Sequence, residues 1–123
     1  MNFYYSDAEK KIIRKELLTN EAQKQAKTLV KGVKSSQLRK YFNEVKYLEV
    51  QTTAKDYAIV EPLVKMLKSK VAYGMRSTTK LPKEFKDFID KAVDAIEDKK
   101  DFDAFVKHFE AILGFYYGEG GRD

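Results

Sequence analysis

The sequence predicts an all-α protein, a single compact bundle of about five helices over residues 1–123. Glycine and proline are sparse, with 6 and 2 residues in the chain. Apolar residues recur at steps of three and four, and β-branched residues rarely alternate with polar ones, which together favour helix over strand. A chain of this length buries about two-thirds of its unfolded surface, so one hydrophobic core is expected.

The first half of the chain is predicted to hold three helical segments. The first runs over residues 7–32, with an N-terminal helix within residues 1–16 and an interruption at Thr19 and Asn20 that can cap a new helix. The second opens at Ser35 or Ser36. The third spans residues 53–74, with Pro62 as a kink or break. The apolar positions of the second and third segments are Leu38, Tyr41, Phe42, Val45, Leu48, Tyr57, Val60, Val64, Leu67 and Val71.

The second half is predicted to hold two helices and a tail. Pro82 marks the entrance of the fourth helix, because proline suits the first turn of a helix. The fifth begins near Asp101, and residues 118–123 are expected to be a flexible tail. Both helices carry aromatic stripes at helical spacing, which indicate core packing rather than a cofactor site. The stripe residues are Phe85, Phe88, Ile89, Ala92, Val93, Ile96, Phe102, Phe105, Val106, Phe109, Ile112, Leu113 and Tyr116.

The positive charge is concentrated in one part of the sequence. The chain has a net charge of +5, from a balance of +8 in residues 1–79 (16 basic, 8 acidic) and −3 in residues 80–123 (8 basic, 11 acidic). The whole excess lies between Lys24 and Arg76. Such polarity favours a polyanionic partner, although lysine also serves solubility alone.

The helix start at residues 34–40 is the most informative tract. A helix N-terminus offers unpaired N–H groups and a positive dipole end, which favour a phosphate nearby. Lys34, Arg39 and Lys40 surround it. The plainer interpretation is that the serines only cap the helix and that the basic residues are only solvated.

The sequence shows no catalytic or metal-binding pattern, and we predict a protein without enzymatic activity or cofactor. The absence of cysteine excludes thiolate chemistry and is compatible with the cytoplasm. His108 and Glu110 form an H-x-E string, but the paired cysteines of a zinc deaminase are missing. No apolar run of membrane-spanning length occurs, and residues 1–11 lack a signal-peptide pattern. We therefore expect a cytoplasmic protein with no membrane partner.

Three ordered strings resemble the small subunit of the type III-A CRISPR effector, the Csm complex. They are SSQLRKYF at 35–42, LKSKVAYGMR at 67–76 and FVKHFEAILGFY at 105–116. The resemblance covers about residues 22–117, with departures at Gly114 and Tyr117, where alanine and histidine are usual.

The resemblance implies a non-catalytic helical bundle that stacks in several copies inside a ribonucleoprotein, beside other Csm subunits. It implies contact with target RNA held against guide RNA, whose duplex a protein recognises by backbone shape and charge. The placement of charge adds the expectation of a head-to-tail stack that salt should weaken. The residues we expect to contact RNA are Lys34, Ser35, Gln37, Arg39, Lys40, Lys68, Lys70 and Arg76.

Two other functions fit the residues. A DNA-binding regulator would insert the helix from Ser36 into the major groove, although no tight helix-turn-helix spacing precedes it. A purely structural adaptor would set its basic face against an acidic protein.

Overall fold

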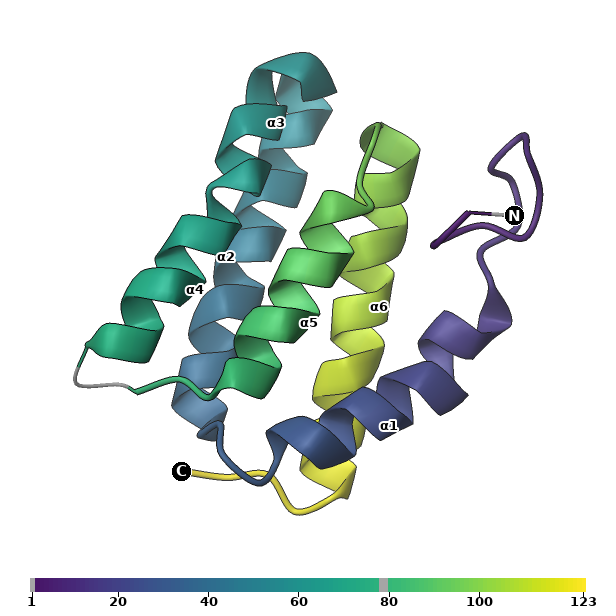
Figure 1. Cartoon of the computed structure of the whole chain (residues 1–123). Coiled ribbons are helices and arrows are strands. Elements are labelled where there is room, and N and C mark those ends of the chain that lie inside the picture. Colours follow the sequence, from purple (N-terminus) through teal and green to yellow (C-terminus); the bar gives the residue numbers. More distant parts are fainter. Residues whose placement is uncertain (1, 78–79) are drawn as a thin grey trace.

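The computed structural model describes residues 2–77 and 80–123 and confirms the all-α prediction (Figure 1). No strand occurs in this described part of the chain, only an isolated bridge between Tyr5 and Ile13. The elements are a 3₁₀ helix η1 (Lys15–Leu18) and the α-helices α1 (Asn20–Leu29), α2 (Ser35–Ala54), α3 (Tyr57–Lys65), α4 (Leu67–Arg76), α5 (Lys83–Asp94) and α6 (Lys99–Gly118).

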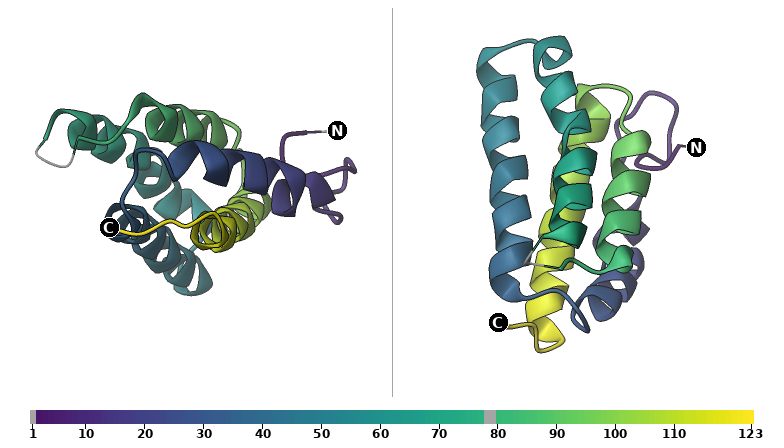
Figure 2. Two further views of the ribbon diagram at one scale, coloured as in Figure 1. Left: turned by 90° about the horizontal axis from the view of Figure 1, so that it is seen from below. Right: turned by 60° about the vertical axis from the view of Figure 1, so that its left-hand side comes forward.

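Helices α1, α2 and η1 pack on α6, which contributes four of the nine buried phenylalanine and tyrosine residues in the described part of the chain. In Figures 1 and 2, α2 runs beside α6 and α4 beside α5, while α1 crosses the lower end of α6. Phe102, Phe105 and Phe109 of α6 are fully buried. Phe109 meets Phe88 of α5 edge to face, with ring centroids 5.5 Å apart, a geometry that aromatic pairs prefer. The predicted aromatic stripes are therefore core.

Residues 2–14 form a folded-back loop, and the predicted helix from Asp7 is wrong. The Asp7 carboxylate accepts hydrogen bonds from the backbone N–H groups of Lys11 and Ile12. Such local side-chain bonds compete with helix formation. Lys10 has a φ of 58°, in the left-handed region. Its ammonium then reaches Asp98 and Asp101, at 2.6 and 3.2 Å.

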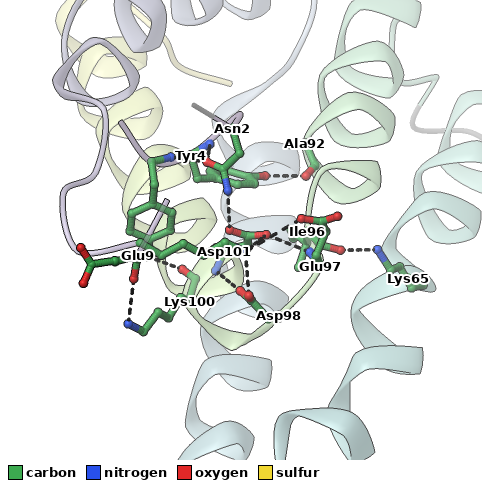
Figure 3. Close-up of polar contacts among 12 residues, drawn as sticks. Asn2, Tyr4, Glu9, Lys65, Ala92, Ile96, Glu97, Asp98, Lys100 and Asp101 are labelled. Carbon is green, nitrogen blue, oxygen red and sulfur yellow. Dashed lines mark hydrogen bonds and ion pairs between the residues drawn. The ribbon is translucent and has the colours of Figure 1, made fainter. Parts of the chain in front are cut away.

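The loop also closes one side of the core. The Tyr4 ring is fully buried, and its hydroxyl donates to the carbonyl of Ala92 (Figure 3). Desolvation raises the pKa of Tyr4 far above its ordinary value. Asp101 is buried beneath the loop and accepts from the Glu97 N–H at 3.0 Å. The N-terminal residues are thus an integral part of the bundle.

The predicted third helix is two helices that meet at Met66. The backbone turns there, but the N–H of Met66 still bonds the Pro62 carbonyl, at 3.1 Å. Proline removes one hydrogen bond of the preceding turn, which favours a bend. α3 packs on α2, whereas α4 packs on α5.

Two further boundaries can be compared with the predictions. The interruption predicted at Thr19 and Asn20 is confirmed, since α1 begins at Asn20 directly after η1. The last helix begins two residues earlier than predicted, because the Asp98 carboxylate accepts from the Asp101 N–H at 3.0 Å. Aspartate is a favoured N-cap.

Candidate nucleic-acid interface

The start of α2 is capped differently from the prediction. The residue before the helix is Lys34, whose backbone N–H donates to Oε1 of Gln37 at 2.8 Å. A glutamine at this position reaches back to an otherwise unpaired N–H, as in a capping box. Neither predicted serine caps the helix with its hydroxyl, and Ser35 Oγ instead lies 3.2 Å from the Tyr117 hydroxyl.

The C-terminal residues fold back onto this helix start. The Ser36 N–H donates to the Asp123 carboxylate at 2.7 Å, and the Ser35 N–H approaches the Arg122 carbonyl at 3.4 Å. The bond from Ser36 lowers the pKa of the Asp123 carboxyl. The site predicted to attract an anion therefore holds one, supplied by the chain itself.

Arg39 lies one turn further along α2 and is oriented by a tyrosine. Its Nη1 donates to the Tyr117 hydroxyl at 3.2 Å. This bond raises the pKa of Arg39 and lowers that of Tyr117. Within residues 2–77 and 80–123, no carboxylate lies within ion-pairing distance of Arg39, so its charge is not offset by a direct ion pair.

A groove of about 700 Å³ runs between α2 and α4. Tyr41 forms part of its lining and donates to the Lys70 carbonyl at 3.4 Å. Burial raises the pKa of Tyr41, which also packs its ring on Phe85 of the core. The groove is lined by Lys40, Tyr41, Glu44, Ser69, Lys70, Tyr73, Gly74 and Ser77.

Two predicted lysines, one from each helix, line this groove. Lys70 of α4 pairs with Glu44 of α2 across it. The Lys40 ammonium lies 5.8 Å from the centroid of the Tyr41 ring, within cation–π range. A phosphate entering the groove would thus meet two ammonium groups and one carboxylate.

Lys68 and Arg76 lie apart from the groove lining. Lys68 pairs with Asp94 of α5 at 2.6 Å, which raises the pKa of Lys68. Its neighbour Lys65 also turns to α5 and donates to the carbonyls of Val93 and Ile96, both at 2.9 Å (Figure 3 shows the contact with Ile96). Arg76 is exposed at the last position of α4.

Arg76 nevertheless ends close to the other basic tract. α2 begins and α4 ends at the same end of the bundle, at the lower left of Figure 1. In the described part of the chain, no carboxylate pairs with the Arg76 guanidinium. The structure therefore places Lys40 and Lys70 in one groove, leaves Lys34, Arg39 and Arg76 outside its lining at the same end of the bundle, and turns Lys68 toward α5.

Sequence reasoning missed the aromatic and hydroxyl groups of the groove. Tyr73 is 76% exposed, the highest value among the exposed large hydrophobic side chains. Tyr73 follows Ser69 by four residues and Lys70 by three, spacings that place side chains on neighbouring parts of a helix surface. The feature of the sequence that could have indicated these groups is Tyr73, a tyrosine within the basic string at residues 67–76.

His108 has a structural position. It is 5% exposed, and its Nδ1 lies 2.6 Å from the Leu17 carbonyl. Burial lowers the pKa of His108. The residues described in the structure contain no group of three histidine, cysteine or acidic side chains suited to hold a metal ion, and none of their helices is long and apolar enough to cross a bilayer.

Comparison with known proteins adds one finding to this geometry. The family model Csm2 Type III-A matches residues 13–121, which include both basic helices, the groove and most of the tail. Comparisons with curated proteins and with solved structures gave no match. Because the family model covers nearly the whole 123-residue sequence, the chain belongs to the Csm2 family, the small subunit of the type III-A CRISPR Csm complex.

Proposed function

We propose that this Csm subunit binds the backbone of target RNA paired with guide RNA and takes no part in catalysis. The surface we assign to RNA, the basic face, consists of Lys34, Ser35, Gln37, Arg39, Lys40, Lys70 and Arg76, with Lys68 at its edge. The observation that carries the proposal is the groove between α2 and α4, which is lined by Lys40 and Lys70. Arg39 of the same helix α2 has no acidic partner among the described residues and donates to Tyr117.

The chemistry of these groups suits phosphates. Arginine offers a planar fork of donors that matches a phosphate, and lysine acts as a mobile point charge. The Lys70–Glu44 pair is exposed, with 45% and 32% of the two side chains accessible. Exposed pairs are weak, so Lys70 can exchange Glu44 for a phosphate at little cost. Sequence selection is left to base pairing between guide and target.

We further propose that copies of the subunit stack beside the other Csm subunits in the cytoplasm. The acidic side chains of α5 offer less free charge for stacking than the sequence implies, since Asp87, Asp90 and Asp94 pair with lysines of the same chain. Apolar side chains on the outer surface of α3 and the adjoining turn are exposed and can contribute contact area. They are Ile59, Leu63 and Met66, at 63%, 46% and 48% accessibility.

RNA binding is tested best in the assembled complex, because stacked copies contribute multivalent affinity that an isolated subunit lacks. We expect Arg39→Ala and Lys70→Ala to weaken target RNA retention and to reduce the salt slope by about 1 for each lost phosphate contact. Lys15→Ala is the matched control, since Lys15 is an exposed lysine of η1, away from the groove. Equal retention by all three variants would favour the adaptor function.

The DNA-binding alternative is tested with the purified subunit, because an assembled complex already holds a guide RNA. Affinities for a guide–target RNA duplex and for a DNA duplex of the same length are compared at matched salt, because phosphate contacts dominate both. Preference for the DNA duplex would contradict the proposed function.

Self-association is measured separately by sedimentation of the purified subunit at low and high salt. Leu63→Lys should reduce it if the apolar surface of α3 takes part. Association that changes neither with salt nor with this substitution would contradict the stacking contacts proposed here.

A further inference from the structure

The C-terminal tail has a defined path back to α2. Gly120 adopts a φ of 95°, a conformation that favours glycine. The Gly121 N–H bonds the Tyr116 carbonyl at 2.9 Å. A Cβ on Gly121 would clash with the ring of Tyr116, so the backbone rests directly on that ring. Tyr116 is itself anchored, since its hydroxyl donates to the Val33 carbonyl at 2.5 Å.

This path delivers a carboxylate to the helix start. Asp123 accepts the Ser36 N–H at 2.7 Å while the backbone of Arg122 lies against Ser35. The carboxylate, like Ser36, is exposed to solvent. An exposed contact of this kind exchanges readily with another anion, because water solvates each partner when it leaves.

We propose that Asp123 is an internal stand-in for an RNA phosphate, so that the tail competes with RNA for the start of α2. This inference rests on the proposed function, and it adds that the subunit holds part of its basic face closed until RNA arrives. A phosphate bound to the Ser36 N–H must displace the carboxylate, because a second anion at the same donor would repel the first. Arg39, held next to Ser35 through Tyr117, can then contact the same strand.

The competition is expected to be modest. An anion at an exposed helix N-terminus contributes an effect of about two- to fivefold in an equilibrium constant. A competitor of this strength lowers RNA affinity without abolishing it, and several stacked copies would multiply the effect.

The test compares two tail variants that lose the same charge. Asp123→Ala removes the carboxylate that contacts Ser36, and Glu119→Ala removes an exposed one earlier in the tail. In assembled complexes at matched salt, we expect Asp123→Ala to bind target RNA more tightly than Glu119→Ala, by about two- to fivefold for each subunit that contacts the RNA. Equal affinities of the two variants would overturn the competition.

A second measurement is independent of RNA. The Ser36 amide signal of the isolated full chain is followed by nuclear magnetic resonance during titration with inorganic phosphate. If the Ser36 signal saturates at a lower phosphate concentration in Asp123→Ala than in Glu119→Ala, the result supports competition between Asp123 and phosphate for the Ser36 N–H. Identical titration curves of the two variants would refute this competition. The proposed function fails instead if Arg39→Ala and Lys70→Ala leave RNA retention unchanged, so the two failures are distinguishable.

Discussion

Gly74→Ala places a methyl group where the groove and the core share a wall. The new Cβ would lie 2.5 Å from Cδ1 of Leu81 and 2.7 Å from the hydroxyl oxygen of Tyr41. Carbon atoms pack best at about 3.5–4.0 Å, so Leu81 must move by about 1 Å or more. Leu81 and Tyr41 are only 4% and 7% exposed. Overpacking of this kind costs about 1–3 kcal/mol.

Gly114→Ala is the matched control for this substitution. Gly114 also lies inside a helix, but nothing stands within 4 Å of the position that its new Cβ would take. Both variants gain about 1 kcal/mol of helix propensity, so the difference between them isolates the steric cost. With an unfolding entropy of about 2.1 cal/mol/K per residue, 1 kcal/mol corresponds to about 4 °C in this chain.

The assay is thermal unfolding of the two variants, followed by circular dichroism. We expect Gly74→Ala to melt about 4–12 °C below Gly114→Ala. Equal melting temperatures would refute this steric cost, because they would mean that Tyr41 and Leu81 can move away from the new methyl group without loss of stability.

Three further substitutions test the core and the N-terminal loop. Burial lowers the pKa of His108 below 6.5, so this histidine takes up a proton more readily in the unfolded state than in the folded state. The free energy of unfolding should therefore be highest above about pH 6.5 and fall on acidification. In urea titrations at several pH values, His108→Gln should make the free energy of unfolding depend less on pH. Tyr116→Phe leaves the buried Val33 carbonyl without its 2.5 Å partner and should cost about 1–2 kcal/mol. Lys10→Ala removes the ammonium beside the buried Asp101 carboxylate and should cost about 1–3 kcal/mol in denaturant unfolding.

Two of these substitutions have a matched control on the surface. Tyr47→Phe alters a tyrosine that is 57% exposed, and Lys11→Ala breaks an exposed pair with Glu9; both should be nearly neutral. A Tyr116→Phe variant as stable as Tyr47→Phe would contradict the proposed anchor. An unchanged acid slope in His108→Gln would mean that other groups carry the pH dependence.

Helical spacing predicted most of the bundle because helices depend on contacts three and four residues apart. For that reason the apolar faces of α2, α5 and α6 and the break before α1 could be predicted from the sequence. The conformation of the loop at residues 2–14 could not be predicted from the sequence. Its conformation depends on Lys10 reaching Asp98 and Asp101, about 90 residues away in sequence, and local patterns carry no information on such partners.

The candidate site was predicted only in part for the same reason. Lys40 and Lys70 occur in strings that the sequence marked as basic, yet their shared groove follows from how α4 is placed against the other helices. The prediction that Lys68 contacts RNA took no account of an acidic partner. Asp94 on the neighbouring helix could be located only in three dimensions.

The turn at Met66 has an architectural consequence. Because α3 packs on α2 whereas α4 packs on α5, the turn carries the chain away from α2 and leaves the groove between α2 and α4. We therefore expect substitutions of the charged lining residues Lys40, Glu44 and Lys70 to alter which ligand is accepted without moving the two helices. A change at Pro62, which lies outside the lining, would alter the dimensions of the groove while leaving its chemistry intact.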